Sequence, residues 1–218
     1  MIIAIDGKSG TGKSTISYLL ATSLNLRYLN SGSIYRCIAY LIMNKYLDIN
    51  SPMFEKDLSK IQIDFKNIDN KQRVILNNKD VTDIIRLEEV TTFTPKIADN
   101  KIIKTYIRNI QYKFVESGNI VIEGRDICTV IAPNADYKFY LYTSVETRAK
   151  RVYEEKIKKE NITYEEVLND LKKRDAEDIL DKNFIEPTNA IKIDTTNLTI
   201  EEVLEIMLKN IKEAHYEK

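Results

Sequence analysis

Residues 7 to 15 read GKSGTGKST and directly follow the apolar run MIIAID. Residues 7 to 14 complete the pattern G-x-x-x-x-G-K-[ST], in which glycines let successive backbone N–H groups turn toward phosphate oxygens. Lys13 would neutralise the β- and γ-phosphates, and the Ser14 hydroxyl would bind Mg²⁺. The sequence therefore predicts a nucleoside triphosphate site formed by nine loop residues: Gly7, Lys8, Ser9, Gly10, Thr11, Gly12, Lys13, Ser14 and Thr15.

The surroundings of this loop favour a phosphate site over a plain glycine-rich turn. By average composition, the pattern occurs by chance in about one chain in a hundred. Here a β-branched, uninterrupted run precedes it, as in strands buried on both faces of a parallel sheet. Apolar residues at helical spacing follow it, which predicts an amphipathic helix over residues 13–24. Three of the six glycines of the chain lie within residues 7–12.

Two arginines near predicted strand ends point to a second phosphorylated ligand. Arg36 follows YLNSGS, and Arg125 lies in EGRD, directly after the strand NIVIE. Ligands of open α/β sheets bind beyond the carboxyl ends of strands, and arginine holds phosphate in two-pronged geometry. Either arginine alone is equally well a surface ion-pair partner. The tetrapeptides D-x-x-G and N-K-x-D of regulatory GTPases are absent from the sequence. We therefore expect a phosphoryl acceptor beside the triphosphate.

The elements that must position these residues alternate between strand and helix. Short apolar runs predict five strands, and helical periodicity predicts the segments between them. The strands are expected at 1–6, 27–30, 119–124, 137–143 and 190–195, and the helices at 13–24, 33–46, 88–117, 145–160, 163–173 and from about 200. This alternation is typical of a parallel α/β sheet flanked by helices, a P-loop NTPase fold. Alternating residues at 61–67 and 73–78 predict a small antiparallel insert over about 61–82.

The stretch from 146 to 182 is highly charged and, with the adjoining Val145, predicts a helical hairpin that can act as a lid. Val145, Ala149, Val152 and Ile157 are expected to face the core. Thr163 with Glu166, and Thr199 with Glu202, have the spacing of capping boxes. The stretch also contains three arginines, Arg148, Arg151 and Arg174.

The amino-acid composition further restricts the class of protein and its possible partners. A chain of 218 residues with 43% hydrophobic residues predicts a globular protein of either one domain with an insertion or two small domains. Thirty-three basic and 33 acidic residues give no net charge, which disfavours nucleic acid as a partner. Cys37, Cys128 and His215 provide neither a disulfide framework nor a Cys/His metal cage. The start of the sequence shows no leader or membrane span, so we expect a cytoplasmic protein without membrane association.

The quoted motifs occur in the order and spacing of one family. IAIDGKSGTGKST, YLNSGSIYR, EGRDICTVIAPNAD, TRAKR, LKKRDAED and IDTTNLTIEEV together resemble bacterial cytidylate kinases along essentially the whole chain. The resemblance implies an adenylate-kinase-like fold and transfer of the γ-phosphoryl group of ATP to CMP or dCMP, with Mg²⁺ and as a monomer. It implies a single domain, 1–218, divided into core (about 1–60, 83–150 and 186–218), insert (about 61–82 with adjoining helices) and lid (about 151–185).

The resemblance also implies residue roles. The catalytic set is Lys13, Arg125, Arg151 and Arg174, with Ser14 binding the metal ion. Arg36 and Arg125 would hold the acceptor phosphate, Arg151 would lie over the migrating group, and Arg174 would approach the phosphates. Asp126 would contact the cytosine edge and Asp178 the ribose. The whole CMP site would consist of Ser31, Arg36, Lys104, Arg125, Asp126, Arg174 and Asp178.

Five positions depart from the family pattern, mostly where the base is read. Asp181 stands where an arginine is usual, and Pro95 where a cytosine-contacting serine is usual. Lys104 replaces an arginine, Cys128 a glycine and Asn30 an aspartate. The sequence therefore leaves the choice among CMP, dCMP and UMP open. It also leaves two alternatives: a related P-loop kinase with a shifted acceptor, and a nucleotide-binding regulatory protein without turnover.

Overall fold

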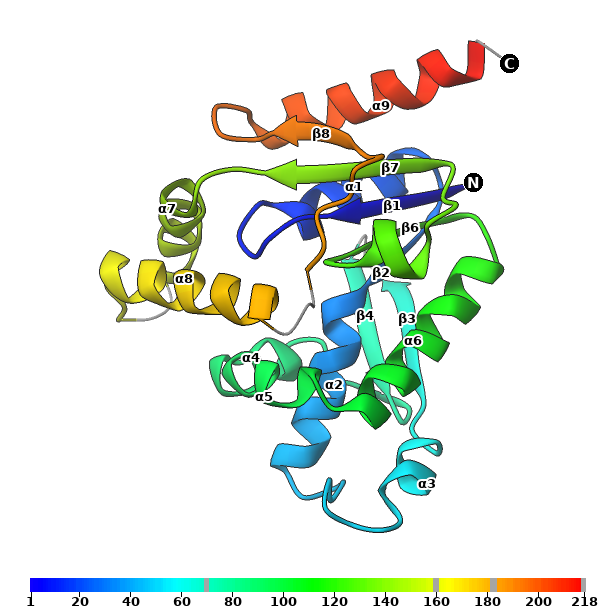
Figure 1. Cartoon of the computed structure of the whole chain (residues 1–218), viewed down its shortest axis with the longest axis vertical. Helices are drawn as coiled ribbons and strands as arrows, with labels where there is room; N and C mark the ends of the chain where they lie inside the picture. Colours follow the sequence, from blue (N-terminus) through cyan, green and yellow to red (C-terminus); the bar gives the residue numbers. More distant parts are fainter. Residues whose placement is uncertain (69–70, 159–160, 181–183, 217–218) are drawn as a thin grey trace. The chain divides into compact units, whose positions relative to one another are not determined.

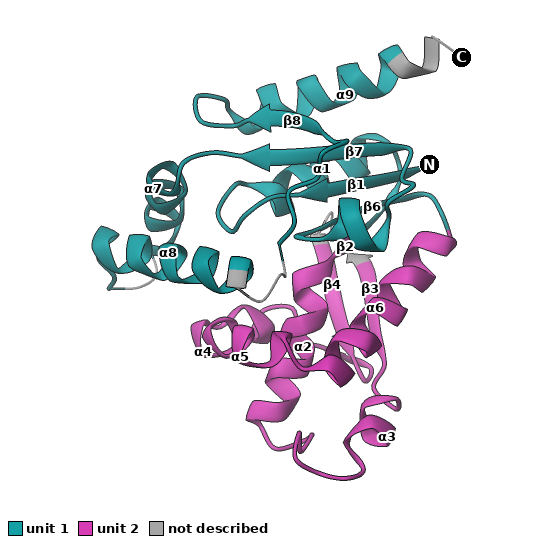
Figure 2. Cartoon of the chain, in the orientation of Figure 1, with its two compact units in different colours: residues 1–28, 118–218 teal, residues 29–117 magenta. Residues whose placement is uncertain are grey.

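The computed structural model describes residues 1–68, 71–158, 161–180 and 184–216. The chain forms two compact units (Figure 2). Residues 1–28 and 118–218 form the first unit, and residues 29–117 form the second. The finer division into core, insert and lid stays a prediction. None of the described helices is long and apolar enough to cross a membrane.

The main sheet has five strands in the order β2-β6-β1-β7-β8 (Figure 1). These are β1 (Ile2–Asp6), β2 (Arg27–Asn30), β6 (Ile120–Gly124), β7 (Tyr137–Tyr142) and β8 (Ile191–Asp194). Strand β1 pairs in parallel with β6 and β7, and β7 pairs in parallel with β8. This confirms the predicted fold class, with strand bounds within one or two residues. The ends of β1 and β6 lie side by side because Asp6 pairs with Gly124.

The described residues of the first unit also form four helices and a short turn of π-helix. They are α1 (Lys13–Ser23), α7 (Val145–Lys156), α8 (Tyr164–Leu180), α9 (Ile200–Tyr216) and the π-helical η2 (Ile127–Ile131). One apolar cluster joins the sheet to α1 and α9, and it includes Ile3, Ile5, Leu20, Val121, Phe139, Leu141, Ile193, Val203, Met207 and Ile211. Both capping boxes are confirmed: the backbone N–H groups of Thr163 and Thr199 donate to Glu166 and Glu202, at 2.8 and 2.7 Å.

The helical pair α7 and α8 has an apolar cluster of its own. Ala149, Val167 and Leu171 are buried in it, and Val145 and Val152 pack against them. The predicted apolar face of this segment is therefore correct for Val145, Ala149 and Val152. It is wrong for Ile157, which is 48% exposed. Helix α7 ends at Lys156, so the helical periodicity no longer places Ile157 on that face.

The second unit combines a three-stranded antiparallel sheet with helices. The sheet has the order β3-β4-β5, with β3 (Ile63–Ile68), β4 (Lys71–Leu76) and β5 (Lys79–Asp80). The predicted hairpin is thus confirmed and extended by one short strand. The helical segments are α2 (Ser31–Met43), α3 (Phe54–Leu58), η1 (Ile84–Arg86), α4 (Glu88–Phe93), α5 (Pro95–Ala98) and α6 (Lys101–Glu116).

The segment 88–117 is helical, as expected, but it is divided into the three helices α4, α5 and α6. Pro95 begins α5, where its missing N–H costs no helical hydrogen bond. Asn100 caps the N-terminus of α6, because its Oδ1 accepts from the N–H groups of Ile102 and Ile103 at 3.0 and 3.1 Å. Helical periodicity continues across these residues, but their backbone chemistry starts a new helix each time.

Candidate functional site

The predicted phosphate loop joins β1 to α1. Gly7 must be glycine, because a Cβ at this position would overlap the carbonyl oxygen of Leu141 on β7. Gly12 has φ 88° and precedes the first residue of α1, a conformation that side chains disfavour. Gly12, the residue before α1, has no side chain that could cap the helix. The N-terminus of α1 therefore suits an anion, which its N–H groups and the helix dipole would favour.

Lys13 lies at the centre of a charged cluster. Its Nζ donates to the carbonyl oxygen of Lys8 at 2.9 Å. Burial lowers the pKa of Lys13, the carboxylate of Glu123 opposes that shift, and Arg125 adds to it. A half-buried ammonium surrounded by charges of both signs is suited to neutralising phosphate.

Ser14 and Glu123 form a pair of oxygen groups at the end of the loop. Ser14 Oγ donates to Glu123 Oε1 at 2.7 Å, and the Tyr28 hydroxyl donates to the same oxygen at 3.2 Å. Glu123 is only 4% exposed. A hydroxyl and a carboxylate are ligands that Mg²⁺ accepts when substrate phosphates and water complete its shell. These residues therefore fit the expected metal ion. Among the described residues, no cluster of three or more His, Cys, Asp or Glu side chains could hold a metal by itself.

Glu123 is a functional residue that sequence reasoning missed. The available signal was a carboxylate at the end of an otherwise apolar strand, IVIEG. Its importance depends on β6 lying next to β1, which the sequence did not specify.

Asp6, the last residue of β1, holds the segment that follows Arg125. Its two carboxylate oxygens accept from the N–H groups of Ile127 and Cys128, at 3.0 and 2.8 Å. Asp6 is fully buried, and this burial raises its pKa to about 6 despite the two hydrogen bonds. Sequence reasoning missed this residue also.

We expect the raised pKa of Asp6 to appear in the pH dependence of stability. The folded state binds this proton more tightly than the unfolded state, so stability falls as the pH rises from about 4 through 6. The loss amounts to about 3 kcal/mol, at 1.36 kcal/mol per pKa unit. Urea unfolding of the wild type and Asp6→Asn, from pH 4.5 to 7.5 with EDTA, measures it. Stability curves that run parallel over this range would contradict the prediction.

Two predicted substrate residues, Arg125 and Asp178, form an ion pair. Asp178 lies on α8 and is 8% exposed. Burial raises its pKa, and the neighbouring Arg125 opposes the shift. Both residues also influence the pKa of Lys13, so the structure brings them together with the phosphate loop. Asp126 lies close enough to Asp6 to contribute to its raised pKa.

The two other predicted catalytic arginines have partners of their own. Arg151 Nη1 donates to Thr195 Oγ1 at 3.1 Å, and Arg151 Nη2 donates to the Thr195 carbonyl oxygen. Arg174 pairs with Asp170 one helical turn away, at 2.8 Å. Their roles toward phosphate stay predictions.

The remaining predicted substrate residues belong to the second unit. Ser31 Oγ accepts from Gln111 Nε2 at 2.5 Å, and Arg36 Nη2 donates to Ser33 Oγ at 3.0 Å. Lys104 pairs with Asp99 at 3.4 Å. Their meeting with the phosphate loop stays a prediction, and Asp181 lies outside the described residues. Gln111, buried on α6, gave no signal in the sequence beyond its helical position.

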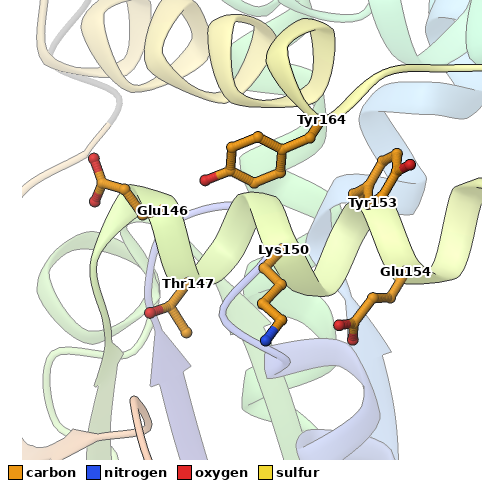
Figure 3. A pocket seen from close by; sticks show the side chains of 6 residues that line it. All are labelled: Glu146, Thr147, Lys150, Tyr153, Glu154 and Tyr164. Atoms are coloured by element: carbon orange, nitrogen blue, oxygen red, sulfur yellow. The ribbon is translucent and has the colours of Figure 1, made fainter.

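A hollow on α7 and α8 lies apart from this machinery (Figure 3). Its lining residues are Glu146, Thr147, Lys150, Tyr153, Glu154 and Tyr164, none of which belongs to the predicted site. The phosphate loop approaches α7 at Arg148 and Val152 instead.

A phosphate loop between the first strand and first helix of a five-stranded parallel sheet defines the P-loop class of nucleotide-binding proteins. Solved structures with this fold include TT1252 from Thermus thermophilus, with a TM-score of 0.51, 17% identity and coverage of 98% of this chain and 97% of that chain. A gluconokinase from Sinorhizobium meliloti has a TM-score of 0.50 and 13% identity, and the match covers 98% of this chain and 94% of that chain. At such identities the likeness shows the fold alone.

The family model of cytidylate kinase matches residues 3–213. The cytidylate kinase of Thermodesulfovibrio yellowstonii is 38% identical, over 97% of this chain and 98% of its own. That of Fusobacterium nucleatum is 39% identical, over 98% of both chains. The chain belongs to the cytidylate kinase family, which confirms the resemblance seen in its motifs.

Proposed function

We propose that this protein transfers the γ-phosphoryl group of ATP to CMP or dCMP and yields CDP or dCDP. The observation that carries the proposal is the grouping of Lys13, the Ser14–Glu123 pair and the Arg125–Asp178 pair around one phosphate loop. This grouping joins the residues expected to bind ATP to two residues expected to bind the phosphoryl acceptor, Arg125 and Asp178. Membership of the cytidylate kinase family supports the same acceptor.

Each group has a task that its chemistry explains. Phosphoryl transfer needs in-line placement and charge neutralisation rather than a protein nucleophile. Lys13 and the loop N–H groups hold the donor phosphates. Ser14 with Glu123 would hold Mg²⁺, which would supply positive charge to the phosphates when bound. Arg125 and Arg36 hold the acceptor phosphate.

The remaining predicted residues orient the nucleoside and enclose the reaction. Asp178 binds the ribose, while Ser31, Lys104 and Asp126 face the base side of the acceptor. Arg151 and Arg174 neutralise the migrating group when the helical pair closes and excludes water. From the sequence we also expect a monomer that acts in the cytoplasm.

Initial rates with ATP and a panel of acceptors test the proposed reaction. CMP, dCMP, UMP, AMP and dephospho-coenzyme A are compared in one coupled assay, and we expect CMP or dCMP to be fastest. A dominant rate with another acceptor would replace the proposal by a shifted-acceptor kinase. Tight ATP binding without transfer to any acceptor would indicate a regulatory nucleotide-binding protein.

Glu123→Gln should lower the apparent affinity for Mg²⁺ more than the apparent affinity for ATP or CMP. The amide keeps the size of the side chain but removes the negative charge beside Ser14. We expect the Mg²⁺ concentration for half-maximal rate to rise about tenfold, in line with the cost of removing one charge-assisted contact. Rates over a Mg²⁺ titration at saturating ATP and CMP measure this. An unchanged midpoint would remove Glu123 from the metal site.

A further inference from the structure

Two residues without an assigned role, Arg148 on α7 and Asp175 on α8, reach the phosphate loop. The Arg148 side chain is only 2% exposed, and its Nη1 donates to the Ser9 carbonyl oxygen at 3.1 Å. Its Nη1 and Nη2 also donate to the two carboxylate oxygens of Asp175, at 3.0 and 2.6 Å. Such a buried two-pronged pair holds a guanidinium in one fixed orientation.

Three consecutive loop residues contact this pair. Lys8 Nζ lies 3.3 Å from Asp175 Oδ2, and Ser9 accepts from Arg148. Gly10 packs so closely that a Cβ there would lie 3.1 Å from Arg148 Cβ. Residues 8 to 10 are therefore held from outside the loop by the two helices.

The hydrogen bond at Ser9 also sets the direction of the next N–H group. In a trans peptide the carbonyl oxygen and the following N–H point in opposite directions. Because the Ser9 carbonyl points toward the Arg148 guanidinium, the Gly10 N–H points away from that guanidinium. Loops of this pattern bind phosphate through such inward-turned N–H groups.

We propose that Arg148 and Asp175 are positioning residues for the triphosphate: Arg148 fixes the Ser9–Gly10 peptide, and Asp175 fixes Arg148 and Lys8. The inference rests on the proposed ATP site but not on the identity of the acceptor. Neither side chain needs to touch the nucleotide. Their effect passes through the shape of the loop, so it should fall on ATP rather than on CMP.

Arg148→Lys and Asp175→Asn test this role. Lysine keeps a positive charge beside Asp175 but lacks the planar fork of donors with which Arg148 reaches Ser9 and both carboxylate oxygens, and asparagine keeps only one acceptor oxygen. We expect each to lower ATP affinity about tenfold by calorimetry and to raise the KM for ATP equally. The KM for CMP should stay within about twofold. The double variant should bind ATP about as well as either single one, because the residues act as a unit.

Lys173→Met and Glu177→Gln serve as matched controls. They remove the exposed ion pair of α8, whose charged atoms are 4.0 Å apart, and should leave ATP affinity unchanged. Thermal unfolding of every variant accompanies the binding data. ATP affinity at the wild-type level in both loop variants would overturn the proposal. Equal weakening of ATP and CMP with a lowered Tm would also overturn it, because it indicates a merely structural pair. The two proposals can also fail separately. If the wild type does not phosphorylate CMP but Arg148→Lys and Asp175→Asn still bind ATP more weakly, the positioning role is supported and the proposed function is refuted.

Discussion

Lys13→Ala should reduce phosphoryl transfer by about three orders of magnitude or more while leaving the fold intact. In loops of this pattern the lysine ammonium contacts the β- and γ-phosphates. Removing a preorganised charge of this kind lowers the rate by about 10²–10³-fold or more. The side-chain hydrogen bond of Lys13 is to the Lys8 carbonyl of the same loop, so the substitution breaks no hydrogen bond to a distant element. Single-turnover rates and circular dichroism measure the two effects.

Lys150→Ala is the control for that experiment. Lys150 lines the hollow on α7 and α8 and has no place in the proposed site (Figure 3). Its removal should leave the rate unchanged. A near-normal rate for Lys13→Ala would mean that residues 7–15 do not hold the transferred phosphate.

Arg125→Ala should abolish most acceptor-dependent turnover, by about 10²–10³-fold, while ATP binding is retained. The side chain follows β6 and lies within electrostatic reach of Lys13, which suits a contact to the acceptor phosphate. The same substitution leaves the buried Asp178 without its ion-pair partner, so the variant should also be less stable.

A second variant separates these two effects. Arg125→Ala combined with Asp178→Asn removes the unpaired charge and should regain stability, but it should not regain turnover. Urea unfolding, ATP calorimetry and CMP-dependent rates are measured on both variants. Equal loss of ATP binding and of turnover would contradict the assignment of Arg125 to the acceptor.

The sequence predicted the first unit better than the second. Strands such as IVIEG and YKFYLY are short apolar runs, so their position follows from composition alone. The helical character of residues 88–117 was predicted, but its division into three helices was not, because periodicity continues across Pro95 and Asn100, where new helices are capped. Ile157 was misplaced because the end of α7 cannot be read from the apolar pattern.

The sequence alone determined the phosphate loop, the parallel α/β class and the family, because each depends on residues close together in the chain or on motifs in fixed order. The tertiary structure decided which distant groups support the loop. Glu123 meets Ser14, Asp6 meets Ile127, and Arg148 meets Ser9, across 109, 121 and 139 residues. These contacts depend on the order of strands in the sheet and on how α7 and α8 pack. The local periodicity of the sequence predicts neither the strand order nor this helix packing, because it shows only which face of a helix or strand is apolar.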